Sequence, residues 1–435
     1  MREVFNNIYD LVLGDEDARA CKDISEEACH EEPKSFGIHI FAMTLSKIGD
    51  GLGDVKLTLT WLLASIGVPA ALVSWLVPTR EALSLLPQLA FASKLRGFPK
   101  RKLFWAFGSL AQGGCIIAMG VTSLFLEGPT AGYIILVLLA VFSLSRGVCS
   151  IAGKDVLGKT VAKRKRGRVS GLATSLAGFG TLSFGALLFL QLIPTKDATL
   201  LSSLLIFAGG LWLIAGMIYA GVPEFPGAVS GGRNGFTEAM ASLKLIVSDG
   251  QLRHFLITRC LFISTALIAP FYVMLANRYA GGGMGTLGLL LLLAGLANLI
   301  SSPFWGKFAD SSSKHVLVVA GLICGILAAM VTLATLLEWP VIHEPEWYAA
   351  VIFVLYIGHA GVRLGRKTYL IDMATQENRA QMVAVSNTFI GVVLLITGGL
   401  STLASRAGAL YAIAIFGVLS LLAAASAKAM QDVSD

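Results

Sequence analysis

Charged residues are scarce in this sequence. Only 14% of the 435 residues are Asp, Glu, Lys or Arg, whereas 55% are hydrophobic, and the mean hydropathy is +0.74. A soluble domain carries about 25% charged residues, so this composition excludes one. The apolar runs are too long for the strands of about 10 residues that build a membrane β-barrel. Because backbone groups in lipid must be bonded within their own segment, these runs predict membrane-spanning helices.

Residue patterns that mark enzymes and metal sites are also missing. The six cysteines give no disulfide framework, and Cys21, Cys29 and His30 lack the spacing of a zinc site. The pair Gly158-Lys159 lacks the spacing of a phosphate-binding loop. No Ser-His-Asp arrangement or dinucleotide fingerprint stands out. We therefore expect no enzyme activity, no metal site and no cofactor.

The apolar segments predict twelve spans, since each span needs about 20 residues to cross about 30 Å of hydrocarbon. The helices are expected near 38–64, 69–93, 103–125, 131–158, 169–192, 198–222, 253–276, 284–306, 315–338, 346–371, 380–403 and 406–428. This organisation gives a cytoplasmic N-terminal segment at 1–36, bundles at 37–222 and 253–428, a linker at 223–252 and a tail at 429–435. The N-terminal segment is polar and has no signal-peptide core, and we expect a surface helix or disorder there.

The net charge of +7 is explained by its location rather than by nucleic-acid binding. Basic residues crowd two loops on one side of the predicted topology: Lys94, Arg96, Lys100, Arg101 and Lys102 in one, and Lys163, Arg164, Lys165, Arg166 and Arg168 in the other. Short basic loops stay in the cytoplasm. Both termini are therefore predicted to be cytoplasmic, and the cytoplasmic (inner) membrane is the expected location. Most of the tryptophans lie near predicted helix ends, as interfacial anchors do.

The two predicted bundles repeat each other at a constant offset of 213 residues. The matched pairs are Lys94 with Lys307, Arg101 with Lys314, Gly108 with Gly321, Lys154 with Lys367, Arg166 with Arg379 and Gly178 with Gly391. One shift without gaps across two loops and their following helices indicates two related halves.

These features resemble the major facilitator superfamily of secondary transporters. That family carries a motif, roughly Gly-x-x-x-Asp-Arg-x-Gly-Arg-Arg, after its second and eighth helices. Gly306, Asp310 and Lys314 fit the second copy, while the first copy keeps its basic end and lacks the acid. Arg146 matches part of a fourth-helix pattern, although Ser150 replaces its glycine. The resemblance implies an all-α membrane protein with twelve helices in two pseudo-symmetric six-helix bundles. The stretches 47–54 and 78–81 resemble a bacterial branch without an assigned substrate.

Charges inside the predicted helices mark the candidate site, because each costs roughly 2.5–3.5 kcal/mol at the bilayer centre. The candidates for binding a substrate or a proton are Lys47, Asp50, Asp54, Arg80, Glu81, Arg146, Arg259, His359 and Arg363. Lys56 falls near the opposite face of a regular first helix. That helix need not be regular, because three alternating glycines at 49, 51 and 53 each weaken it by roughly 1 kcal/mol. We expect a bend or a broken turn there.

Two interpretations of these charges remain open. They line a polar cavity between the halves, or they form structural ion pairs such as Lys47–Asp50, Asp54–Arg146 or Arg80–Glu81. In the first case Asp50, Asp54 or Glu81 carries a proton, because repulsion and desolvation favour a neutral carboxyl. Counting Lys56 with the nine candidates but leaving out His359, the bases exceed the acids by three, which favours an anionic or zwitterionic solute.

The leading prediction is a secondary active transporter, a symporter or antiporter that moves a small solute by alternating access and is coupled to protons. The expected partners are the solute, the proton and the lipid bilayer, with no nucleic acid, and the expected state is a monomer. The loop carrying Gly306, Asp310 and Lys314 would gate the inward-facing state. The alternative is a non-transporting relative that binds pigment, lipid or a partner complex, which predicts bundles packed without a central cavity.

Overall fold

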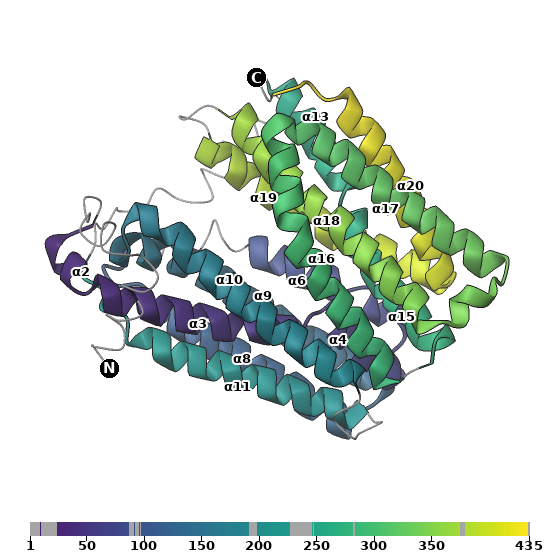
Figure 1. The fold of residues 1–435 in the computed structure, drawn as a ribbon, viewed down its shortest axis with the longest axis horizontal. Coiled ribbons are helices and arrows are strands. Elements are labelled where there is room, and N and C mark those ends of the chain that lie inside the picture. The colour runs from purple at the N-terminus through teal and green to yellow at the C-terminus, as the bar shows by residue number, and fades with distance from the viewer. Residues whose placement is uncertain are drawn as a thin grey trace.

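Helices account for all the regular structure in the part of the chain that this computed structural model describes. That part comprises residues 9, 24–86, 91, 95, 97–190, 198–226, 246, 248–281, 283–374 and 379–433, and it contains no strand. Two helical bundles meet around α4 and α15 and diverge toward the side where α2 and α13 lie (Figure 1). The prediction of an all-α membrane protein is confirmed.

The first bundle is built from residues up to Ala220. After the short α2 (Glu26–His30), its helices are α3 (Glu32–Leu52), α4 (Thr58–Ser65), α5 (Ala70–Val73), α6 (Leu76–Leu85), α8 (Lys102–Phe125), α9 (Gly128–Thr160), α10 (Lys163–Phe189) and α11 (Ala198–Ala220). The pairs α3–α4 and α5–α6 take the places of the first and second predicted helices, each broken into two pieces.

The second bundle begins at Gly250. Its helices are α13 (Gly250–Leu261), α14 (Ser264–Leu267), α15 (Ala269–Tyr279), α16 (Met284–Ser311), α17 (Ser313–Leu336), the short 3₁₀ helix η1 (Pro340–His343), α18 (Pro345–Met373), α19 (Arg379–Arg406) and α20 (Ala409–Ala429). Within the described residues, ten helical segments are long and apolar enough to cross a membrane, with 250–279 counted as one. Together with the two broken helices they account for the twelve predicted crossings.

The bend expected in the first crossing is present as a complete break. Helix α3 ends at Leu52, α4 begins at Thr58, and the residues between them form a turn. The Asp54 carboxylate accepts hydrogen bonds from the backbone N–H of Lys56 (2.9 Å) and Leu57 (3.0 Å). These bonds satisfy donors that the break would leave open inside the membrane, where an unsatisfied backbone group is costly.

The glycine at position 49 lets α3 lie close to α11. A Cβ atom there would stand 2.7 Å from Nε1 of Trp212 and 3.1 Å from the carbonyl oxygen of Ala208. Small residues allow membrane helices to approach closely when no side chain separates their backbones. The glycines of the first helix therefore serve packing as well as the break.

The loop predicted after the eighth helix is almost absent. Helix α16 continues past its predicted end at 306 to Ser311, and α17 begins at Ser313. The hydroxyl of Ser312 accepts a hydrogen bond from the backbone N–H of His315 (3.3 Å) and so caps α17 immediately. Gly306 is therefore helical, and Lys314 belongs to the first turn of α17.

The N-terminal segment is attached to the first bundle by a buried polar cluster. Glu32 accepts hydrogen bonds from Tyr9 (2.6 Å), from Lys165 (2.9 Å) and from the backbone N–H of Ala162 (2.7 Å). Residues 1–8 and 10–23 lie outside the described part, as do 227–245 of the predicted linker. Cys29 is disulfide-bonded, which the cysteine spacing did not predict. The other described cysteines are free.

Candidate functional site

A cavity of about 390 Å³ lies beside the break between α3 and α4. Its lining residues are Gly49, Asp50, Gly53, Asp54, Val55, Lys56, Leu59, Val77, Arg80, Glu81, Ser84, Ile116, Leu139, Phe142, Arg146, Trp212 and Arg363. Arg363 comes from the second bundle and all the others come from the first. The cavity volume falls in the range that holds small organic ligands, about 300–1,000 Å³.

Asp50 is held between two arginines on the cavity wall. Its Oδ1 atom lies 2.6 Å from Nη1 of Arg146 and 3.2 Å from Nη2 of Arg80. The three side chains come from α3, α9 and α6, so this cluster joins three helices. None of the three ion pairs considered from the sequence occurs among the described residues, since Asp50 and not Asp54 or Glu81 pairs with the arginines.

Aromatic rings support the two guanidinium groups. Arg80 lies over the Phe142 ring at 5.2 Å from its centroid, and Arg146 lies over the Trp212 ring at 5.8 Å. A desolvated cation gains about 2 kcal/mol from such a contact. Trp212 is 4% exposed and lines the cavity from the middle of α11, away from the helix ends where most of the tryptophans were expected.

The other two acids of the cavity have different surroundings. The Asp54 carboxylate is engaged by backbone N–H groups and accepts a longer hydrogen bond from the Tyr356 hydroxyl (3.5 Å). Glu81 lines the cavity without an ion pair within 4 Å among the described residues. The cations close enough to interact with its charge are Lys56, Arg80, Arg146 and Arg366. Glu81 therefore faces positive charge from both bundles.

A hydrogen-bonded chain crosses from one bundle to the other at Lys56. The Lys56 Nζ atom lies 3.1 Å from Nε2 of His359, and Nδ1 of His359 lies 3.0 Å from the Thr265 hydroxyl. Lys56 also lines the cavity. Its position at the break carries it off the face expected for a regular helix, which is why the sequence alone did not single it out.

Six of the nine candidate residues line the cavity, and three do not. Lys47 donates instead to the Thr174 hydroxyl (3.0 Å), and the buried Arg259 donates to Ser386 and to the Asn387 amide oxygen (3.0 Å). His359 touches the cavity only through Lys56. The cavity wall thus carries four cations and three acids, and the positive excess is one instead of the three counted from the sequence.

The repeat offset of 213 residues recurs in these contacts. Thr174 and Asn387 are 213 positions apart, and each accepts a hydrogen bond from a cation on the first crossing of its own half. Arg146 and His359 are also 213 positions apart. The halves are therefore related in their polar contacts as well as in their loops.

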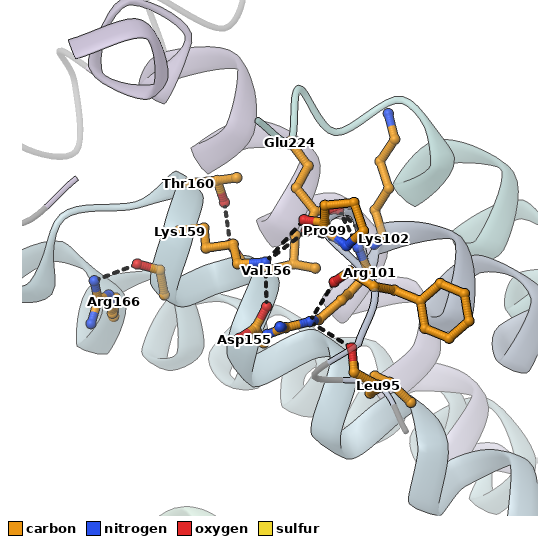
Figure 2. A network of polar contacts seen from close by, with 12 residues as sticks. Leu95, Pro99, Arg101, Lys102, Asp155, Val156, Lys159, Thr160, Arg166 and Glu224 are labelled. Carbon is orange, nitrogen blue, oxygen red and sulfur yellow. Dashed lines mark hydrogen bonds and ion pairs between the residues drawn. The ribbon is translucent and has the colours of Figure 1, made fainter. Parts of the chain in front are cut away.

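A second polar network ties the ends of α8, α9 and α11 together. The carboxylate of Glu224 accepts hydrogen bonds from the backbone N–H of Arg101 (2.7 and 2.9 Å) and of Lys102 (2.7 Å), at the N-terminus of α8. Arg101 pairs with Asp155, and Lys159 bridges Asp155 (2.9 Å) and Glu224 (3.4 Å), as Figure 2 shows. Arg101 and Lys102 of the predicted basic loop are consequently held in place by a network of hydrogen bonds and ion pairs.

The predicted gating residues lie at the α16–α17 junction. Gly306 has open space where a Cβ would stand, and Lys314 is partly buried. The side chain of Asp310 lies outside the described residues. Next to Gly306, the Trp305 Nε1 atom donates to the Ile357 carbonyl oxygen (2.8 Å) and attaches α16 to α18.

Comparison with known proteins agrees with this architecture. The family model described as Major Facilitator Superfamily matches residues 254–430. A crystal structure of a D-xylose-proton symporter aligns with a TM-score of 0.69 at 11% identity, covering 92% of this chain and 98% of the other. A POT family transporter in complex with a thioalcohol conjugated peptide gives 0.67 at 11%, covering 90% and 95%. The nucleoside transporter NupG gives 0.64 at 12%, covering 90% and 99%.

No curated protein matches the sequence. The TM-scores of 0.69 and 0.64 show a shared fold. At identities of 11–12% this likeness identifies no substrate. The fold implied by the resemblance is confirmed over 92% of the chain, and the family model itself matches the second half.

Proposed function

We propose that this multi-pass membrane protein, which has the fold of the major facilitator superfamily, is a secondary active transporter for a small anionic or zwitterionic solute. The observation that carries the proposal is the charged cavity of about 390 Å³, lined from both bundles at the break in the first crossing. Charges held inside a membrane at this cost usually line a solute or ion pathway. Alternating access is then possible if one bundle rocks against the other around the cavity.

Arg363 is the cation best placed to meet the solute. It is exposed to the cavity, and its hydrogen-bond partner among the described residues is the neutral amide of Asn298 (3.4 Å). Arg80 and Arg146, by contrast, already share Asp50. An anionic group on the solute would complete the charge balance of Arg363, while the acids of the first bundle would hold a cationic group.

Proton coupling is part of the proposal, and the surroundings of the acids favour Glu81 as a carrier. Asp50 is neutralised by two guanidinium groups, and Asp54 is engaged by two backbone N–H groups. Glu81 has no such fixed partner among the described residues. The cations around it, Arg366 of the second bundle among them, favour its ionised form in this state, so Glu81 would take up a proton when the bundles move apart. Asp50 and Asp54 stay the second and third candidates.

The experiment is uptake of labelled monocarboxylates and amino acids into proteoliposomes with an imposed pH gradient. We expect gradient-driven accumulation of one of these classes. Glu81→Gln should abolish accumulation while exchange of solute across the membrane persists, because the binding cations stay in place. The proposal fails if no solute class moves, or if Glu81→Gln, Asp50→Asn and Asp54→Asn all accumulate solute as the parent does.

We further propose a monomer in the cytoplasmic membrane with both termini in the cytoplasm, divided at the linker 223–252, with the junction of Gly306, Asp310 and Lys314 as a gate. The cavity speaks against a non-transporting role in binding pigment, lipid or a partner complex, because that alternative predicts bundles without a central chamber. Nucleic-acid binding plays no part in this proposal.

A further inference from the structure

The hydrogen-bonded chain through His359 joins the two bundles at one point. Lys56 belongs to the break of the first crossing, His359 to α18 and Thr265 to α14. Near it, the Tyr356 hydroxyl reaches Asp54 (3.5 Å), so α18 touches the break twice. On the same side of the molecule as α4 and α15, Asn277 donates to Ser65 (3.5 Å). The chain is therefore part of the contact that closes this side.

The hydrogen bonds assign the positions of the protons on His359. The Thr265 hydroxyl donates to the carbonyl oxygen of Phe262 (2.9 Å), so its oxygen accepts from Nδ1–H of His359. Nε2 then carries a lone pair, and the Lys56 ammonium donates to it. Each hydrogen-bonding atom of this chain of contacts then has one partner, and the imidazole is neutral.

A proton added to Nε2 cannot coexist with this contact. It would remove the acceptor that Lys56 uses and set an imidazolium against an ammonium at 3.1 Å. The charged groups that act on His359 are Lys56 from the break and Arg363 and Arg366 from α18 itself, and all three are cations. The remaining neighbours do not offset them, since Thr265 of α14 is neutral and Cys324 of α17 packs against Gly358.

The acids in this region act on His359 only through Lys56. Asp54 and Glu81 interact with Lys56 rather than with the imidazole, and their charges favour the ammonium form of Lys56. Separation of the bundles on the α4–α15 side would carry Lys56 away from His359 and leave Nε2 open to water.

We propose that His359 binds a proton, and that the bound proton and the Lys56–His359 hydrogen bond exclude each other. A proton from water on the α4–α15 side binds Nε2 when that side is open. The proton must be released before the contact with Lys56 can form again. The proton has therefore left His359 in the state described here, in which the α4–α15 side is closed. This inference rests on the alternating access of the proposed function and adds His359 to it as a second coupling group besides Glu81.

The test measures opening of the α4–α15 side directly. Ser65→Cys and Asn277→Cys are introduced together into the full-length chain, reconstituted, and treated with a short bifunctional thiol cross-linker between about pH 5 and pH 8, where histidine titrates. The rate at each pH is divided by that of the same double-cysteine chain carrying His359→Gln, because loss of thiolate alone slows cross-linking as the pH falls. We expect this ratio to fall several-fold at the acidic end, because protonated His359 favours the open state. The chain without the added cysteines corrects for the native thiols.

His359→Gln is the decisive variant, since its amide accepts from Lys56 and donates to Thr265 without titrating. This side should stay closed at every pH in the variant, so its cross-linking rate should change with pH only through the ionisation of the thiols. Thr265→Ser keeps the hydroxyl and should behave as the parent. The inference is overturned if the parent and His359→Gln show the same dependence of the cross-linking rate on pH.

Failure of this inference is separable from failure of the proposed function. A parent that opens with pH but moves no solute in the proteoliposome assay contradicts transport and leaves the His359 site standing. A parent that transports, with His359→Gln unchanged in both cross-linking and accumulation, contradicts the His359 site alone. Elution of each variant as a single peak in size-exclusion chromatography establishes that it is folded.

Discussion

Arg146 and His359 hold equivalent positions in the two halves, and each bonds to the first crossing of its own half. Arg146 forms an ion pair with Asp50 of α3, whereas His359 forms a neutral hydrogen bond with Thr265 of α14. The place that matches Asp50 is occupied by Ile263. The duplicated position has thus become a fixed charge in one half and a neutral hydrogen-bonding group in the other.

The contributions of Asp50 and Arg146 to the stability of the protein should depend on each other. Asp50→Asn removes the charge that compensates two guanidinium groups, and we expect a loss of roughly 1.5–3 kcal/mol in stability, the range for hydrogen bonds to charged groups. Thermal unfolding in detergent measures the loss as a lower melting temperature. The double variant Asp50→Asn/Arg146→Gln should lose less than the two single losses added together. Strict additivity would show that the two side chains do not interact.

Arg363 and Lys367 provide a matched pair for solute recognition. Both lie on α18 one turn apart, but only Arg363 lines the cavity. Arg363→Gln should raise the KM for an anionic solute about tenfold or more, since a charged hydrogen bond contributes roughly 1.5–3 kcal/mol. Lys367→Gln should leave KM unchanged. Equal effects of the two substitutions would indicate a general loss of positive charge and not a contact with the solute.

Glu224 should stabilise the N-terminus of α8. Its carboxylate accepts from two backbone N–H groups there, and loss of such a cap costs about 0.5–2 kcal/mol. Glu224→Ala is expected to speed hydrogen exchange in the first turn of α8, as measured by mass spectrometry, with little change in α17. Glu346→Ala, at an exposed position, is the control and should change neither helix. Unaltered exchange in α8 would contradict the capping role.

The glycine at position 49 should resist enlargement. Gly49→Ala places a methyl group against Trp212 and the backbone of α11, and overpacking of this kind costs about 1–3 kcal/mol. Gly114 of α8 has no atom within 4 Å of the same methyl position. Gly114→Ala is therefore expected to keep or slightly raise the melting temperature. If both alanines had the same effect, helix propensity and not the close approach of α3 and α11 would decide the stability.

The fold was predictable because membrane spans depend on local composition alone. Long apolar runs and the 213-residue repeat are both visible in the chain, and the glycines at 49, 51 and 53 indicated the break. Helix ends were less predictable. Helix α16 runs past 306 because Ser312 caps the next helix at once, and a hydroxyl cap is visible only when its backbone partner is known.

The pairing of the charges required the structure. Spacing on the first helix placed Lys56 on the wrong face, because the break changes the direction of the chain before Lys56 is reached. Which acid meets which arginine depends on the relative positions of α3, α6 and α9, and no periodicity encodes that. Trp212 gave no signal of its own, since an aromatic in an apolar helix is equally suited to lipid and to a cavity wall.

The joint between α16 and α17 is a single residue, Ser312. A connection of one residue does not let the two helices move independently. Any tilt of α16 must be transmitted to α17, and through the Trp305–Ile357 bond to α18 as well. Helices α16, α17 and α18 of the second half should therefore tilt together as one rigid unit when the bundles move.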